Sequence, residues 1–165
     1  LFRSKLSLAR SFGATHTIDA SISDPVSEIL ALTGGLGLDY AVEASGQIKV
    51  IEQAFESVRR GGGECVFATH PEHGNKISID PYELICGKQI RGSWGGGSNI
   101  DRDIPIFAQL YLDGKLPLQK LITKRYSLDA INEALDDLEQ HRVGRPLIEI
   151  DTSIGSYNTS KEKNN

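Results

Sequence analysis

Apolar positions change their spacing twice between Leu38 and Ala68, and each change predicts a new element. Residues 38–42 form a largely apolar run that stops at the small residues Ala44-Ser45-Gly46. Apolar positions from Ile48 to Val58 then recur three and four residues apart, as on one face of a helix. A second apolar run, 65–68, follows the glycines 61–63. This strand–helix–strand order predicts a parallel strand pair joined by a crossover helix.

The same alternation continues along the chain to residue 150 and predicts an α/β fold with a mostly parallel sheet. Helices are expected over about 3–13, 25–34, 81–85 and 99–112, and a last helix from about 131 is expected to be broken by Gly144. Further strands are expected at 15–18, 88–94, 121–126 and 145–150. We expect one domain over residues 1–150, followed by a polar, disordered tail over 151–165.

Composition narrows the function classes. With 165 residues, 39% of them hydrophobic, the chain can bury a core, and its net charge of -4 argues against a broad nucleic-acid surface. No apolar run is long enough to cross a membrane. The chain has no Met, which favours a fragment or a processed chain. Cys65 and Cys86 lack metal-ligand spacing, and we expect two unpaired thiols in the cytoplasm.

Several short stretches together resemble the coenzyme domain of zinc-type medium-chain alcohol dehydrogenases. They begin with Ala9–Thr15, Gly37–Gly46 and Gly61–Gly63. Arg91–Gly96, Leu121–Thr123, Ile131–Ala134 and Gly144–Ile148 continue the family's order. The resemblance covers about residues 3–150 and implies an incomplete, Rossmann-like, doubly wound sheet. NAD or NADP is the coenzyme it implies.

Two parts of the family pattern are missing from this sequence. The family's catalytic domain supplies Cys and His ligands to an active-site zinc, and no such segment is present. The Gly-x-Gly-x-x-Gly turn, whose glycines and helix N-terminus cradle phosphate, is also absent. The resemblance therefore implies zinc only through a missing catalytic domain, and the chain alone is expected to be inactive.

The resemblance assigns coenzyme contacts to ten residues. They are Lys5 for the adenosine ribose; Ala44 and Ser45 for the adenine pocket; Ala68, Thr69 and His70 for the nicotinamide ring; Ser93, Trp94 and Gly95 for the carboxamide; and Arg145 for the pyrophosphate.

Some of these residues also have ordinary structural interpretations. Lys5 suits a solvated helix face, Trp94 a core or interface aromatic, and Arg145 a surface salt bridge. His70 has no Cys or acidic neighbour at metal-ligand spacing, so we expect it to be neither catalytic nor a metal ligand. Glu43 and Asp39 could suggest acid–base chemistry, but solvation or capping is the favoured interpretation. The acidic residues Asp136, Asp137 and Glu139 are expected to form a solvated helix face.

The sequence thus indicates the coenzyme-binding part of a zinc-dependent NAD(P) alcohol dehydrogenase, acting on a small alcohol or aldehyde. A zinc-free quinone oxidoreductase of the same superfamily remains an alternative, as does a non-catalytic binding or oligomerisation module. Neither nucleic acid nor membrane is expected as a partner. A homodimer or homotetramer is expected, and a dimer would pair through the strand near Lys88–Trp94.

Overall fold

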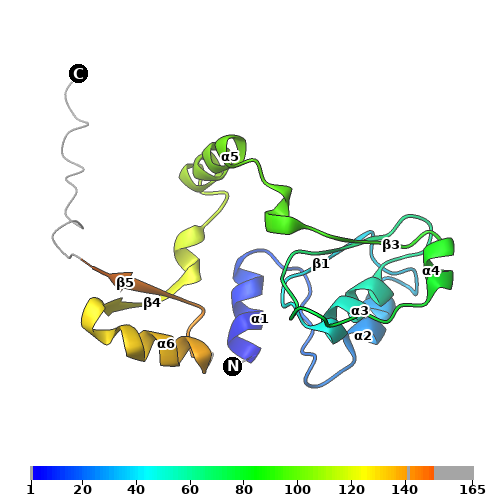
Figure 1. The fold of residues 1–165 in the computed structure, drawn as a ribbon, viewed down its shortest axis with the longest axis horizontal. Coiled ribbons are helices and arrows are strands. Elements are labelled where there is room, and N and C mark those ends of the chain that lie inside the picture. The colour runs from blue at the N-terminus through cyan, green and yellow to red at the C-terminus, as the bar shows by residue number, and fades with distance from the viewer. Residues whose placement is uncertain (1, 141, 151–165) are drawn as a thin grey trace. The chain divides into compact units, whose positions relative to one another are not determined.

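The computed structural model describes residues 2–140 and 142–150, which form two compact units (Figure 1). The first unit is residues 2–103 and the second begins at residue 104, so the boundary falls inside helix α5 (Ile100–Leu112). The expected single domain over 1–150 stays a prediction. The expected polar tail, 151–165, lies outside the described residues.

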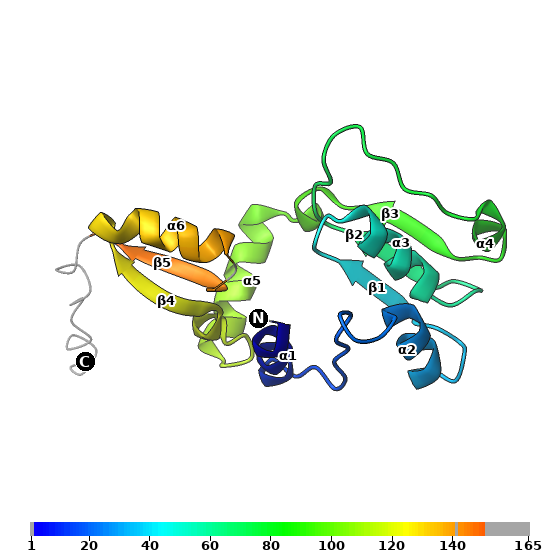
Figure 2. The same cartoon turned by 90° about the horizontal axis from the view of Figure 1, so that it is seen from below.

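A three-stranded parallel sheet forms the centre of the first unit. Its strands are β1 (Tyr40–Glu43), β2 (Glu64–Phe67) and β3 (Gln89–Gly92), in the order β1-β2-β3. Helix α3 (Ile48–Ser57) connects β1 to β2 and packs against both strands (Figure 2). The strand–helix–strand unit predicted from the spacing of apolar residues is therefore confirmed.

The core of this unit lies between α3 and the sheet. Phe55 and Val58 are 2% and 1% exposed and pack with Cys65, which is fully buried. Ala41, Ala54, Ile79 and Ile90 close around this cluster. Gly63 lets the chain turn tightly before β2, because a Cβ there would lie 2.4 Å from the carbonyl oxygen of Arg59. Cys65 and Cys86 are both unpaired, as the sequence predicted.

Three further helices belong to the first unit, and each was predicted. They are α1 (Phe2–Ser11), α2 (Pro25–Leu32) and α4 (Pro81–Ile85). Helices α2 and α4 begin with proline directly after an aspartate. The Asp24 carboxylate accepts a hydrogen bond from Ser27 N, and Asp80 accepts one from Tyr82 N. Each aspartate is thus an N-cap, because its carboxylate accepts a hydrogen bond from an amide that has no partner within the first turn of the helix.

The strand predicted at Thr15–Ile18 is wrong. Thr15, Thr17 and Ile18 favour extended backbone locally, but a strand also needs a neighbour that pairs with its amide and carbonyl groups. Within the part of the chain that the structure describes, no strand pairs with this segment. Thr17 instead accepts a side-chain hydrogen bond from Arg10 at 3.0 Å.

The second unit has a two-stranded parallel sheet of its own. Strand β4 (Ile122–Ser127) pairs with β5 (Arg145–Glu149), and helix α6 (Ile131–Glu139) connects them and packs on both (Figure 2). Short 3₁₀ turns, Leu118–Leu121 and Leu128–Ala130, flank β4. The described strands therefore form two parallel sheets, where the sequence had suggested one.

Asp137 links α6 to the sheet of the second unit. Its side chain is largely buried and accepts hydrogen bonds from Tyr126 Oη at 2.5 Å, Lys124 Nζ at 3.1 Å and Arg142 Nε at 2.6 Å. These hydrogen bonds hold the pKa of the Asp137 carboxyl well below its usual range. The prediction that Asp137 lies on a solvated helix face is wrong, because the residue is buried. The three hydrogen bonds replace the water that the carboxylate loses on burial.

Candidate functional site

The three parallel strands of the first unit end at one edge of their sheet, and each continues into a predicted contact segment. Residues 44–46 follow β1, residues 68–70 follow β2, and residues 93–95 follow β3. Parallel strands that start in register bring their carboxyl ends together. The structure therefore gathers eight of the ten predicted residues at this edge, which we call the strand-end edge: Ala44, Ser45, Ala68, Thr69, His70, Ser93, Trp94 and Gly95.

Glu43 is the last residue of β1, and its side chain ties two segments of the strand-end edge together. One carboxylate oxygen, Oε1, accepts hydrogen bonds from Ser45 N and Ser45 Oγ, both at 2.5 Å, and from Gly46 N at 2.9 Å. The other oxygen, Oε2, accepts one from Thr69 Oγ1 at 2.9 Å. The capping role favoured by the sequence is confirmed. The bond to Thr69 was missed, because it joins residues that are far apart in the chain.

Two opposing effects set the pKa of the Glu43 carboxyl. Burial favours the neutral acid and raises the pKa, since only 2% of the residue is exposed. The hydrogen bonds from Ser45, Thr69 and Gly46 favour the ionised form, and together they outweigh burial. The pKa of Glu43 therefore lies below its ordinary value, and the carboxylate is charged at neutral pH. With donors on both oxygens, the ionised Glu43 carboxylate acts as a cap for the turn after β1.

His70 and Trp94 meet edge to face at the ends of β2 and β3. Their ring centroids are 4.5 Å apart and the rings are inclined at 76°. Trp94 is nonetheless 83% exposed, so it is not the core aromatic that the sequence left open. It begins a 3₁₀ turn, Trp94–Gly97, in which Gly95 has a φ of 56°. The turn therefore presents an aromatic ring to solvent.

Lys5 and Arg145 lie outside the strand-end edge. Lys5 is exposed on α1, as a solvated helix charge would be. Arg145 is exposed at the start of β5 and belongs to the second unit. Their expected contacts with ribose and pyrophosphate stay predictions.

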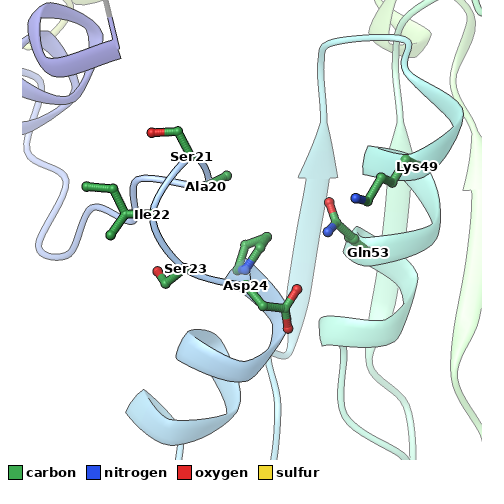
Figure 3. Close-up of a pocket in the computed structure, with 8 residues that line it drawn as sticks. Ala20, Ser21, Ile22, Ser23, Asp24, Lys49 and Gln53 are labelled. Atoms are coloured by element: carbon green, nitrogen blue, oxygen red, sulfur yellow. The ribbon is translucent and has the colours of Figure 1, made fainter.

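A separate hollow of about 430 Å³ lies between the loop before α2 and one side of α3 (Figure 3). Ala20, Ser21, Ile22, Ser23, Asp24, Pro25, Lys49 and Gln53 line it. The side chains of Lys49 and Gln53 extend from α3 toward this loop. None of the ten predicted contact residues lines the hollow, so we assign it no role in the site.

The described residues do not fit a zinc site. Among them, no group of three or more His, Cys, Asp and Glu side chains lies close enough to hold a metal ion. Asp39, the other carboxylate considered for acid–base chemistry, pairs with Arg59 at 2.5 Å on the surface. None of the helices in residues 2–140 and 142–150 is long and apolar enough to span a membrane.

Comparison with protein families gives a match over the whole of the first unit and all but the last residue of α5. The family model of zinc-binding dehydrogenases matches residues 2–111. The chain is 33% identical over 149 residues to an S-(hydroxymethyl)glutathione dehydrogenase from Komagataella pastoris, and it spans 39% of that relative's length. Over 145 residues it is 32% identical to a protein of the same name from Escherichia coli, again spanning 39%.

Solved structures of alcohol dehydrogenases share the fold. Benzyl alcohol dehydrogenase from Acinetobacter calcoaceticus matches 90% of this chain with a TM-score of 0.84 at 31% identity. An alcohol dehydrogenase zinc-binding domain protein from Burkholderia ambifaria matches 90% with a TM-score of 0.83 at 34% identity. The chain spans 41% and 40% of these two structures. The incomplete, Rossmann-like α/β fold expected from the sequence is confirmed.

Proposed function

Because the chain belongs to the zinc-binding dehydrogenase family, we propose that it is the coenzyme-binding part of a zinc-type, NAD(P)-dependent alcohol dehydrogenase. The reaction is hydride transfer between a small alcohol or aldehyde and nicotinamide. The observation that carries this proposal is the meeting of three predicted contact segments, 44–46, 68–70 and 93–95, at the strand-end edge. Open α/β sheets bind ligands at this kind of edge.

The residues at the strand-end edge suit a dinucleotide. Ala44, Ser45 and Gly46 are small, so they leave the turn after β1 open to a flat base. The Ala68 and Ser93 amides donate to Glu43 O and Phe67 O in the sheet, so the remaining backbone groups of 68–70 and 93–95 supply hydrogen-bond partners for the nicotinamide end. The exposed Trp94 ring supplies apolar surface. When bound, the nicotinamide accepts or donates the hydride, and this chain's part is to bind and orient it.

Zinc enters the proposal only through the longer parent protein. Catalytic zinc usually needs three protein ligands, and the described residues offer no such group. We therefore assign this chain no step that passes through the metal. The matched relatives are named for alcohol or hydroxymethyl substrates, which supports an alcohol dehydrogenase parent over the zinc-free quinone oxidoreductase alternative.

We further propose a cytoplasmic homodimer or homotetramer. Two unpaired cysteines fit a reducing compartment. Among residues 2–140 and 142–150, only β2 pairs with strand β3, and the other edge of β3 carries backbone groups with which a second copy could pair. Cross-links that join β3 to its symmetry mate would support this dimer, and cross-links that keep the two strands far apart would contradict it.

Calorimetry with NAD and NADP, together with a panel of short alcohols assayed with added zinc, tests the proposed function. The 165-residue chain should bind coenzyme more weakly than micromolar and show no turnover. Hydrogen bonds to charged groups contribute about 1.5–3 kcal/mol each, and the chain lacks the glycine turn that would hold phosphate. Micromolar binding with turnover would contradict the proposal, as would no binding of either coenzyme at millimolar concentration.

A further inference from the structure

The Glu43 side chain forms a bridge between the turn after β1 and the turn after β2. Three of its four donor groups belong to the turn after β1, and the fourth, Thr69 Oγ1, belongs to the turn after β2. We call these contacts the Glu43 clamp. The clamp spans 26 positions of sequence, from residue 43 to residue 69.

Backbone contacts place the two turns next to each other, but they do not set how the side chain of one turn faces the amides of the other. Glu43 O accepts a hydrogen bond from Ala68 N at 3.0 Å, which continues the sheet ladder by one residue. At Gly46 the backbone has a φ of 74°, and a Cβ there would lie 3.4 Å from the Thr69 side chain. The turns therefore approach closely, and the carboxylate fixes how the hydroxyl of one turn faces the amides of the other.

The chemistry of the clamp requires a carboxylate. All four groups that face the two oxygens are hydrogen-bond donors as the structure has them, and an ionised carboxylate only accepts. A glutamine would direct its NH₂ at one of these donors, and an aspartate would be too short by one methylene to reach both turns. A buried charge is costly unless its hydrogen bonds are complete, and at Glu43 they are.

We propose that Glu43 is a positioning residue: its carboxylate sets the separation of the turns 44–46 and 68–70, so that a dinucleotide meets both turns already in place. The proposal rests on the proposed function, which assigns the adenine end to the first turn and the nicotinamide end to the second. A ligand that spans both turns should depend on the clamp, and a ligand that touches only one should not.

Binding of NAD and of AMP to the 165-residue chain tests this, measured by ligand-observed NMR at millimolar concentration. Thr69→Val removes only the hydroxyl that joins the turns, whereas Thr69→Ser keeps it. The Thr69→Val substitution should weaken NAD binding by about tenfold, as expected for losing one hydrogen bond to a charged group, and change AMP binding by less than about twofold. Thr69→Ser should keep NAD binding within about twofold of the unsubstituted chain.

Glu52→Gln is the matched control, because the half-buried Glu52 carboxylate also accepts a hydrogen bond from a residue 26 positions away, Ser78 N, and neither residue is among the ten predicted contacts. It should leave both ligands' affinities unchanged. Equal NAD affinity for the Thr69→Val and Thr69→Ser variants would overturn the clamp, and so would equal losses of NAD and AMP binding.

Amide hydrogen exchange separates failure of the clamp from failure of the proposed function. Glu43→Gln keeps the side-chain volume but offers one acceptor oxygen in place of two. It should speed exchange at Ser45 and Gly46 by about tenfold or more, because their amides lose a charged acceptor. If the unsubstituted chain binds neither ligand, the proposed function fails. The exchange rates then show by themselves whether the Glu43 carboxylate holds the turn. Unchanged exchange in Glu43→Gln would overturn it.

Discussion

Hydrogen bonds decide whether a buried side chain of this protein carries a charge, as Glu43 and Cys65 show. Glu43 is almost fully buried, and neutral hydroxyl and amide groups stabilise its charge. Cys65 belongs to β2 of the same sheet and is part of the core, and burial raises the pKa of its thiol to about 11. Similar burial therefore leaves one group ionised and the other neutral at physiological pH.

The lowered pKa of Glu43 predicts a specific dependence of stability on pH. Its contribution is fully present above its ordinary pKa of 4.5 and is lost as pH falls through the lower pKa of the folded state. Glu43→Gln should therefore unfold at lower urea concentration than the unsubstituted chain at about pH 7, and the difference should shrink at about pH 3.5. Glu72→Gln, in an exposed loop, should match the unsubstituted chain at both values. A difference that grows on acidification would contradict this.

At the scale of elements, local sequence signals predicted most helices and the turns between them. Asp24-Pro25 and Asp80-Pro81 mark helix starts. This signal is local, because each capping aspartate binds an amide no more than three residues further along the chain. The signals failed at Thr15–Ile18, where strand formation depends on a pairing partner elsewhere in the chain. They also missed the Glu43–Thr69 bond and the burial of Asp137, because both depend on contacts between separate elements.

Helix α3 should be the element whose packing contributes most to the first unit. Phe55 is 2% exposed in its core, whereas Leu32 on α2 is 53% exposed. Phe55→Ala should destabilise the chain by about 3–5 kcal/mol, because it removes a buried ring and leaves a cavity. Leu32→Ala should cost less than about 1 kcal/mol, since most of that side chain stays in water. Urea unfolding measures both, and equal losses would contradict the assigned core.

The whole chain is built from two units with separate cores and separate sheets. Phe55, Val58 and Cys65 form the core of residues 2–103, whereas Asp137 and Tyr126 connect α6 to β4 in the second unit. Each unit closes its own parallel strand pair through its own crossover helix. The sequence suggested one sheet because helices and strands alternate along it without a break. That alternation does not show which strands pair with each other.

Loss of the Asp137 contacts should therefore destabilise one unit more than the other. Asp137→Asn leaves Tyr126, Lys124 and Arg142 without their charged acceptor, so amides of β4, β5 and α6 should exchange faster. Amides of β1, β2 and β3 should keep their exchange rates. Glu133→Gln is the control, because Glu133 also binds Lys124 but is exposed. Equal acceleration in both units would show that they unfold as one.

Coenzyme binding at the strand-end edge is the central claim, and amide chemical shifts of the isotopically labelled chain during titration with NAD and NADP test it most directly. With at least one of the two coenzymes, the largest shifts should fall in residues 44–46, 68–70 and 93–95, with the indole NH of Trp94 among them. Shifts confined to residues 104–150, or no shift at millimolar concentration of either coenzyme, would contradict the account.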